Sequence, residues 1–132
     1  QVTLETGAVL SGGKVTGFVV NQGTIRDINF VGAEIKGGTL AGHVVNNSPI
    51  HSRFIDVCLA AESEIRGGFL QGQITAEQAQ IPAALMQLTV QAGSQLSSNI
   101  VAADTVVIAD DVESIAPVAQ CGSQTELASE FE

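Results

Sequence analysis

The chain has 132 residues, of which 45% are apolar and 14% are charged, and its formal net charge is −9. Low charge with a high apolar content excludes an intrinsically disordered chain, and the length fits one domain. Fourteen acidic residues face five basic ones, with no Trp or Tyr, which argues against a nucleic-acid partner. No apolar run approaches the ~18 residues that cross a membrane, so we expect no membrane insertion. Without an initiating Met, the chain is expected to be a processed product or a piece of a larger protein.

Internal repeats are the main signal of the sequence. Residues 7–21 align with residues 32–46 at an offset of 25, and a third copy at residues 64–76 follows at an offset of 30. Within each copy the apolar residues alternate with polar ones, which is typical of a strand with one buried face. Gly-Gly pairs and Asn-rich stretches between these runs indicate sharp corners.

Short strands at a period of 25–31 residues predict a β-solenoid in which each repeat forms one coil. We expect an all-β fold, a single-stranded parallel β-helix of about 4–5 right-handed coils over residues 1–118. Equivalent apolar positions of the repeats should then stack as inward columns. The expected columns are Leu10, Ile35, Ile65 and Leu96; Val15, Leu40 and Leu70; Val19, Val44 and Ile74; and Phe30, Leu59 and Val90.

The C-terminal third changes its period. Apolar residues recur there every six residues, which is typical of triangular β-helices with ~18 residues per coil; they are Ile100, Val106, Val112 and Val118. Residues 119–132 are expected to form a tail or a short capping helix. Residues 123–126 have the pattern of a capping box, and Leu127 and Phe131 lie four residues apart.

Three sets of polar residues are candidates for chemistry. Asp27 and Asp56 occupy equivalent repeat positions, so they should stack, either as solvated surface groups or as an acid/base or cation-holding pair in a groove. Asn21 above Asn46 predicts an asparagine ladder. Asp104, Asp110, Asp111 and Glu113 lie near corners, where turn chemistry and Ca²⁺ binding are the alternatives. We assign no catalytic residue, no metal and no cofactor.

The chain has two cysteines, Cys58 in an apolar run and Cys121 in a polar segment. They are far apart, without a CxxC motif, and only two His accompany them. We therefore expect neither a disulfide framework nor a zinc site. Cys58 is expected to be a small buried or half-buried filler.

Three strings of the sequence carry a family resemblance. Residues 37–48 read Gly-Gly-Thr-Leu-Ala-Gly-His-Val-Val-Asn-Asn-Ser, residues 56–60 read Asp-Val-Cys-Leu-Ala, and residues 65–72 read Ile-Arg-Gly-Gly-Phe-Leu-Gln-Gly. Together they resemble the GGTLxGxIxN repeat arrays of large bacterial surface or secreted proteins, over roughly residues 7–110. The resemblance implies a non-catalytic spacer or display module in adhesion or matrix assembly. Its partners would be its parent chain or other surface components, at the cell surface or outside the cell, with the cytoplasm as the alternative.

Weaker resemblances keep other functions open. The six-residue period is similar to that of the polymerising bactofilin β-helices, which implies a homo-oligomer joined through the solenoid ends. Thirteen successive positions divisible by five, from Leu10 to Leu70, are apolar, which resembles the four-sided pentapeptide-repeat helix. However, Phe18, Ile28, His43 and Arg53 stand where that family needs a small residue. A β-helix enzyme acting on polysaccharide through Asp27 and Asp56 is the third alternative.

Overall fold

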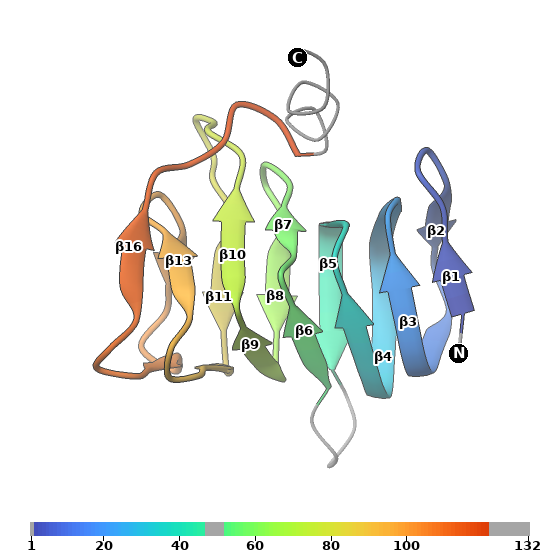
Figure 1. Cartoon of the computed structure of the whole chain (residues 1–132), viewed down its shortest axis with the longest axis horizontal. Coiled ribbons are helices and arrows are strands. Elements are labelled where there is room, and N and C mark those ends of the chain that lie inside the picture. The colour runs from blue at the N-terminus through green and yellow to red at the C-terminus, as the bar shows by residue number, and fades with distance from the viewer. Residues whose placement is uncertain (1, 47–51, 122–132) are drawn as a thin grey trace.

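The computed structural model describes residues 2–46 and 52–121, which form a β-solenoid of about six turns (Figure 1). These residues contain no helix, and their strands pair in parallel throughout. The predicted all-β solenoid is therefore confirmed, with more coils than the 4–5 expected. Of the tail or short capping helix predicted for residues 119–132, the structure describes only residues 119–121, which are not helical. The predicted capping box at residues 123–126, with Leu127 and Phe131, lies outside the described residues.

Three faces make up each coil, and some strands bend from one face to the next. The first face holds β1 (Val2–Leu4), the end of β3 (Lys14–Asn21), the end of β4 (Thr24–Lys36), β6 (Arg53–Ile55), β9 (Phe69–Gln71), β12 (Thr89–Val90) and β15 (Val107–Ile108). The second holds β2 (Val9–Ser11), the starts of β4 and β5 (Thr39–Asn46), β7 (Cys58–Leu59), β10 (Gln73–Ala76), β13 (Gln95–Ser97) and β16 (Glu113–Ile115). The third holds the start of β3, the middle of β4, the end of β5, β8 (Glu64–Arg66), β11 (Ala84–Met86) and β14 (Val101–Ala102).

Each coil is shorter than one sequence repeat. Thr24 pairs with Val9 and with Thr39, fifteen residues away on either side. Further along, Gln73 pairs with Gln95 at a spacing of 22 residues. The prediction that one coil contains 25–31 residues is therefore wrong. Three sides of about five residues look alike in sequence, so an offset of 25 matches a residue with its counterpart on a different side.

The inward columns consequently differ from those expected, although nearly all the residues chosen for them are buried. Leu10 lies beside Ile25 and Leu40 on the second face, and its expected neighbour Ile35 lies on the first. The three longest inward columns are Val2, Val19, Ile35, Phe54, Leu70, Val90 and Ile108; Leu10, Ile25, Leu40, Leu59 and Ala76; and Ile28, Val44, Ile65, Leu85 and Ala102.

A reversal of the chain ends the stack of coils. After β16 the chain runs back over the coils, past β13 and β10, towards β7 (Figure 1). We call residues 116–121 the strap. Val118 pairs with Glu77, since its N–H donates to the carbonyl of Ala76 (2.9 Å) and its carbonyl accepts the N–H of Gln78 (2.8 Å). The strap therefore lies beside the end of β10, and it runs back towards earlier coils while the coils themselves advance towards β16.

Candidate functional site

Asp27 and Asp56 lie at different corners of the solenoid. Asp27 lies within β4 between the second and third faces, and Asp56 lies between β6 and β7, where the first face turns into the second. Both residues have positive φ values, 51° and 54°, a left-handed conformation that Asp tolerates at turns. The prediction that they stack is therefore wrong, and they do not form an acid/base or cation-holding pair.

Each of these carboxylates instead binds the backbone of the next coil. Oδ1 of Asp27 accepts the N–H of His43 (3.0 Å), and Oδ1 of Asp56 accepts the N–H of Gln73 (2.8 Å). Near the C-terminal end, Asp111 accepts the N–H of Gly93 with both carboxylate oxygens (3.0 and 3.1 Å). A corner interrupts the ladder of backbone hydrogen bonds, so a side-chain acceptor there satisfies a backbone donor.

The contacts of Asp27 lower its pKa below the ordinary value of 3.8. The main cause is the hydrogen bond from the His43 N–H, and Arg26, whose Nε lies 3.6 Å from Oδ2 of Asp27, adds to it. A carboxyl whose pKa is lower in the folded state stabilises that state above its unfolded pKa, and this contribution is lost as the pH falls through the folded value.

We therefore expect the stability difference between the wild type and Asp27→Asn to depend on pH. The amide keeps an oxygen acceptor for the His43 N–H but carries no charge. The wild type should be the more stable of the two above about pH 4, and the difference should vanish in stronger acid. Urea unfolding of both proteins along a pH series measures this, together with an NMR titration of the Asp27 carboxyl. A difference that does not change with pH, or a titration at or above pH 3.8, would contradict the assignment.

The glycine facing each of these carboxylates has no room for a side chain. A Cβ on Gly42 would meet Oδ1 of Asp27, and a Cβ on Gly72 would meet Oδ1 of Asp56. Both glycines have positive φ values, 67° and 81°. Gly12, by contrast, has a φ of 78° with no atom within 4 Å of its Cβ position.

Gly42→Ala is accordingly expected to destabilise the protein more than Gly12→Ala does. The left-handed backbone costs about 1–2 kcal/mol at either position. At Gly42 the collision with Asp27 adds a packing cost of about 1–3 kcal/mol. Thermal unfolding followed by circular dichroism compares the two variants. Equal melting temperatures would show that Asp27 moves aside freely and that its bond to His43 contributes little.

The predicted asparagine ladder is also wrong. Asn21 lies between the first and second faces, is 2% exposed, and accepts the N–H of Gly23 (2.9 Å) with its Oδ1. Asn46 ends β5 on the third face, where its side-chain amide lies 3.3 Å from Oγ of Ser52. The two amides thus stabilise two different corners and do not stack on each other.

Cys58 and Cys121 form a disulfide, with 5.7 Å between their Cα atoms. This overturns the expectation that the two cysteines form no disulfide, although Cys58 is buried as expected, at 7% exposure. Cys58 lies on the second face beside Thr39 and Thr75, in a row whose side chains point away from the core. A separation of 63 residues along the chain is no obstacle, because the strap returns across three coil spacings to reach Cys58.

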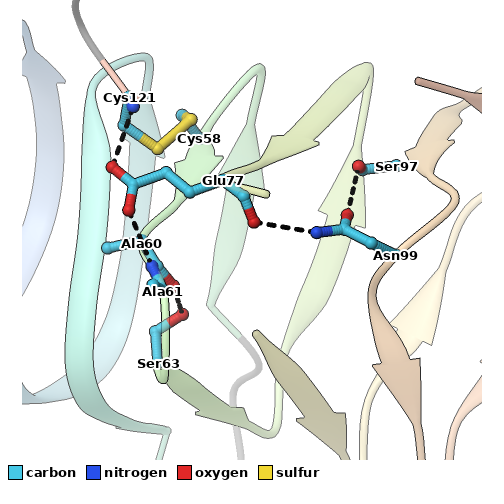
Figure 2. The surroundings of a disulfide bond; sticks show 8 residues. All are labelled: Cys58, Ala60, Ala61, Ser63, Glu77, Ser97, Asn99 and Cys121. Carbon is cyan, nitrogen blue, oxygen red and sulfur yellow. Dashed lines mark hydrogen bonds between the residues drawn. A yellow bond between two sulfur atoms is a disulfide. The ribbon is translucent and has the colours of Figure 1, made fainter. Parts of the chain in front are cut away.

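Glu77 connects the strap to the coils, and no feature of the sequence singled it out. Figure 2 shows its carboxylate between the two segments: Oε1 accepts the N–H of Ala61 (2.9 Å) and Oε2 accepts the N–H of Cys121 (2.9 Å). Its backbone carbonyl accepts Nδ2 of Asn99 (2.8 Å), and Oγ of Ser97 lies 2.6 Å from Oδ1 of Asn99. Glu77 is half-buried, and this network uses both of its carboxylate oxygens.

The C-terminal acidic residues do not converge. Within residues 2–46 and 52–121, no group of three or more His, Cys, Asp or Glu is placed to hold a metal ion. Of the four candidates, Asp111 binds the backbone of Gly93.

The same described residues include no helix that is long and apolar enough to cross a membrane.

A shallow groove of about 360 Å³ lies where the third face turns into the first, across three successive coils. None of its lining residues has an ionisable side chain, so the groove supplies no general acid, base or metal ligand from its own walls. They are Gly68, Phe69, Gln87, Leu88, Thr89, Thr105 and Val107.

Comparisons of the chain with protein-family models, with curated proteins and with solved structures find no match.

Proposed function

We propose that the chain is a non-catalytic structural or interaction module, a rigid β-solenoid spacer or display segment of a larger bacterial surface-associated protein. The observation that carries this proposal is the use made of its acidic side chains. Asp27, Asp56, Asp111 and Glu77 accept backbone N–H groups at corners or from the strap. Side chains committed in this way stabilise a shape and are poorly available for chemistry on a substrate.

The disulfide supports the location that goes with this function. Disulfides form and persist in secreted and surface proteins, whereas cytoplasmic thiols are kept reduced. Cys58 and Cys121 are the only cysteines of the chain, and they pair with each other. We infer an extracellular or cell-surface location with a role in adhesion or matrix assembly, and the cytoplasm is the alternative.

Self-assembly is a second candidate, favoured by the last coil. The strap leaves this coil without a following one, so β14, β15 and β16 each pair on one side only among the described strands. Val101, Val107 and Ile108 are exposed there, at 55%, 63% and 41%. Unpaired strand edges with apolar side chains are templates for further pairing.

Light scattering of the purified chain over a wide range of protein concentration, with and without Ca²⁺, distinguishes these functions. A structural module should keep the mass of a monomer, 13.6 kDa, under every condition. An increase in the measured mass with protein concentration that Val107→Lys abolishes would favour self-assembly instead.

A separate assay with a panel of polysaccharides tests for an enzyme. Cleavage that is lost in both Asp27→Asn and Asp56→Asn would overturn the non-catalytic assignment.

A further inference from the structure

We propose that Glu77 is a positioning residue for the Cys58–Cys121 disulfide, which makes the strap a redox-dependent closure of the last three coils. The fastening of the strap to the coils does not depend on the role of the whole protein as a spacer.

The coils of the second face separate the two cysteines. β7 pairs with β10, β10 with β13, and β13 with β16, and the strap follows β16. The return of the strap across these coils brings Cys121 to Cys58 in the folded chain, where the two residues form a disulfide. The disulfide therefore joins the strap to a coil that lies three pairings before the last one.

Glu77 holds the cysteine end of the strap. Of the contacts that join the strap to the coils, the pairing of Val118 lies three residues before Cys121. At Cys121 itself, the N–H is bound by Oε2 of Glu77, while Oε1 binds Ala61 in the turn that follows β7. One carboxylate therefore fixes the backbone of Cys121 against the coil that contains Cys58 (Figure 2).

The charge of Glu77 also strengthens its hold on the strap. Residues 67–132 contain no Lys or Arg, so no basic residue from this half of the sequence can pair with the Glu77 carboxylate. Its contacts are two N–H donors, and hydrogen bonds of this kind to a charged acceptor are stronger than neutral ones. Neutral or truncated side chains at this position should therefore hold Cys121 less tightly.

The chemistry that Glu77 favours is ordinary thiol–disulfide exchange. With glutathione disulfide as the oxidant, the thiolate of one cysteine attacks a glutathione sulfur and releases one glutathione thiolate. The second cysteine loses its proton and attacks the resulting mixed disulfide. This forms the Cys58–Cys121 bond and releases the second glutathione. Two protein thiols are oxidised and one glutathione disulfide is reduced to two glutathione molecules. Glu77 binds the backbone N–H of Cys121, and it acts by raising the effective concentration of one cysteine near the other.

The test is the equilibrium constant of the disulfide in glutathione redox buffers, measured on the full chain by alkylation and mass spectrometry. Glu77→Ala is expected to lower this constant by about tenfold, the loss that fits one charge-assisted hydrogen bond. Glu77→Gln, which keeps one oxygen acceptor, should restore part of it. Glu113→Ala removes the same charge from an exposed position on β16 and should leave the constant unchanged.

Two results of this redox-buffer measurement would overturn the proposal. One is a constant for Glu77→Ala within twofold of the wild type, and the other is an equal fall for Glu113→Ala. Hydrogen exchange of the wild type keeps the idea testable if Glu77→Ala does not fold. Reduction should speed exchange at the amides of Ala61, Val118 and Cys121 while leaving Ile35 unchanged. Unchanged exchange at those three amides would likewise contradict a redox-dependent strap.

Discussion

Cys121→Ser is expected to lower the free energy of unfolding by about 4 kcal/mol. The disulfide spans 63 residues of sequence, and a loop of this size removes roughly that much conformational freedom from the unfolded chain. For a chain of this length, the loss corresponds to a fall in melting temperature of roughly 10–15 °C. Thermal unfolding by circular dichroism, with and without a reductant, measures the effect.

The reduced wild type is the matched control for this variant. Because Cys121 contributes to stability mainly through the disulfide, the reduced wild type and the serine variant should unfold at nearly the same temperature. The reductant should have no effect on the variant itself. A wild type whose melting temperature is the same with and without reductant would show that the strap carries little of the stability.

Phe54→Ala is expected to cost about 3–5 kcal/mol, the usual range for a buried phenylalanine. Phe54 is fully buried in the inward column of the first face, between Ile35 and Leu70. Its ring packs against that of Phe30 in an edge-to-face arrangement, with 5.1 Å between the ring centres. Removing it leaves a cavity in the middle of the solenoid, where coils on both sides depend on the same contact.

Phe18→Ala provides the control for that loss. Phe18 lies on the same face but points outward and is 36% exposed. Its replacement should cost about 1 kcal/mol or less, the usual size for a surface change. Urea unfolding of the two variants separates the cases. Similar losses at both positions would mean that the assignment of inward and outward sides is wrong.

The class of fold could be predicted from the sequence because alternation and corners are local signals. Residues 14–21 alternate and the Gly-Gly pairs mark turns whatever the register, and both features are present in the structure. The register could not be predicted, because the five-residue sides of a coil are nearly equivalent. Leu10 and Ile35 match in sequence but lie on different faces.

The five-residue spacing of apolar residues carries over in part. Leu10, Ile25 and Leu40 lie fifteen residues apart in one inward column, because three sides of five residues close a coil there. Val20 and Val45, in contrast, lie beside Lys36 and Arg66 in outward rows.

The candidate site was harder to predict than the fold. The predicted register was wrong and therefore placed Asp27 and Asp56 at the same corner. In the structure each of them accepts a backbone hydrogen bond from the next coil at its own corner. The disulfide was missed because distance along the chain does not measure distance in a stack of coils. Pro117 was the available signal, because a proline two residues after the end of β16 indicates that the strand cannot continue. Nothing in the sequence indicated that the chain would then turn back to Glu77.

Peptide mapping of the unreduced protein, secreted into an oxidising compartment, tests most directly whether the strap is joined to the coils by the disulfide. Trypsin cuts after Arg53 and Arg66, and no Lys or Arg follows, so Cys58 and Cys121 fall in the two peptides 54–66 and 67–132. The structure predicts that these two peptides are recovered as one linked species, which reduction separates. Recovery of both peptides unlinked, each with an alkylated cysteine, would contradict the return of the strap to Cys58.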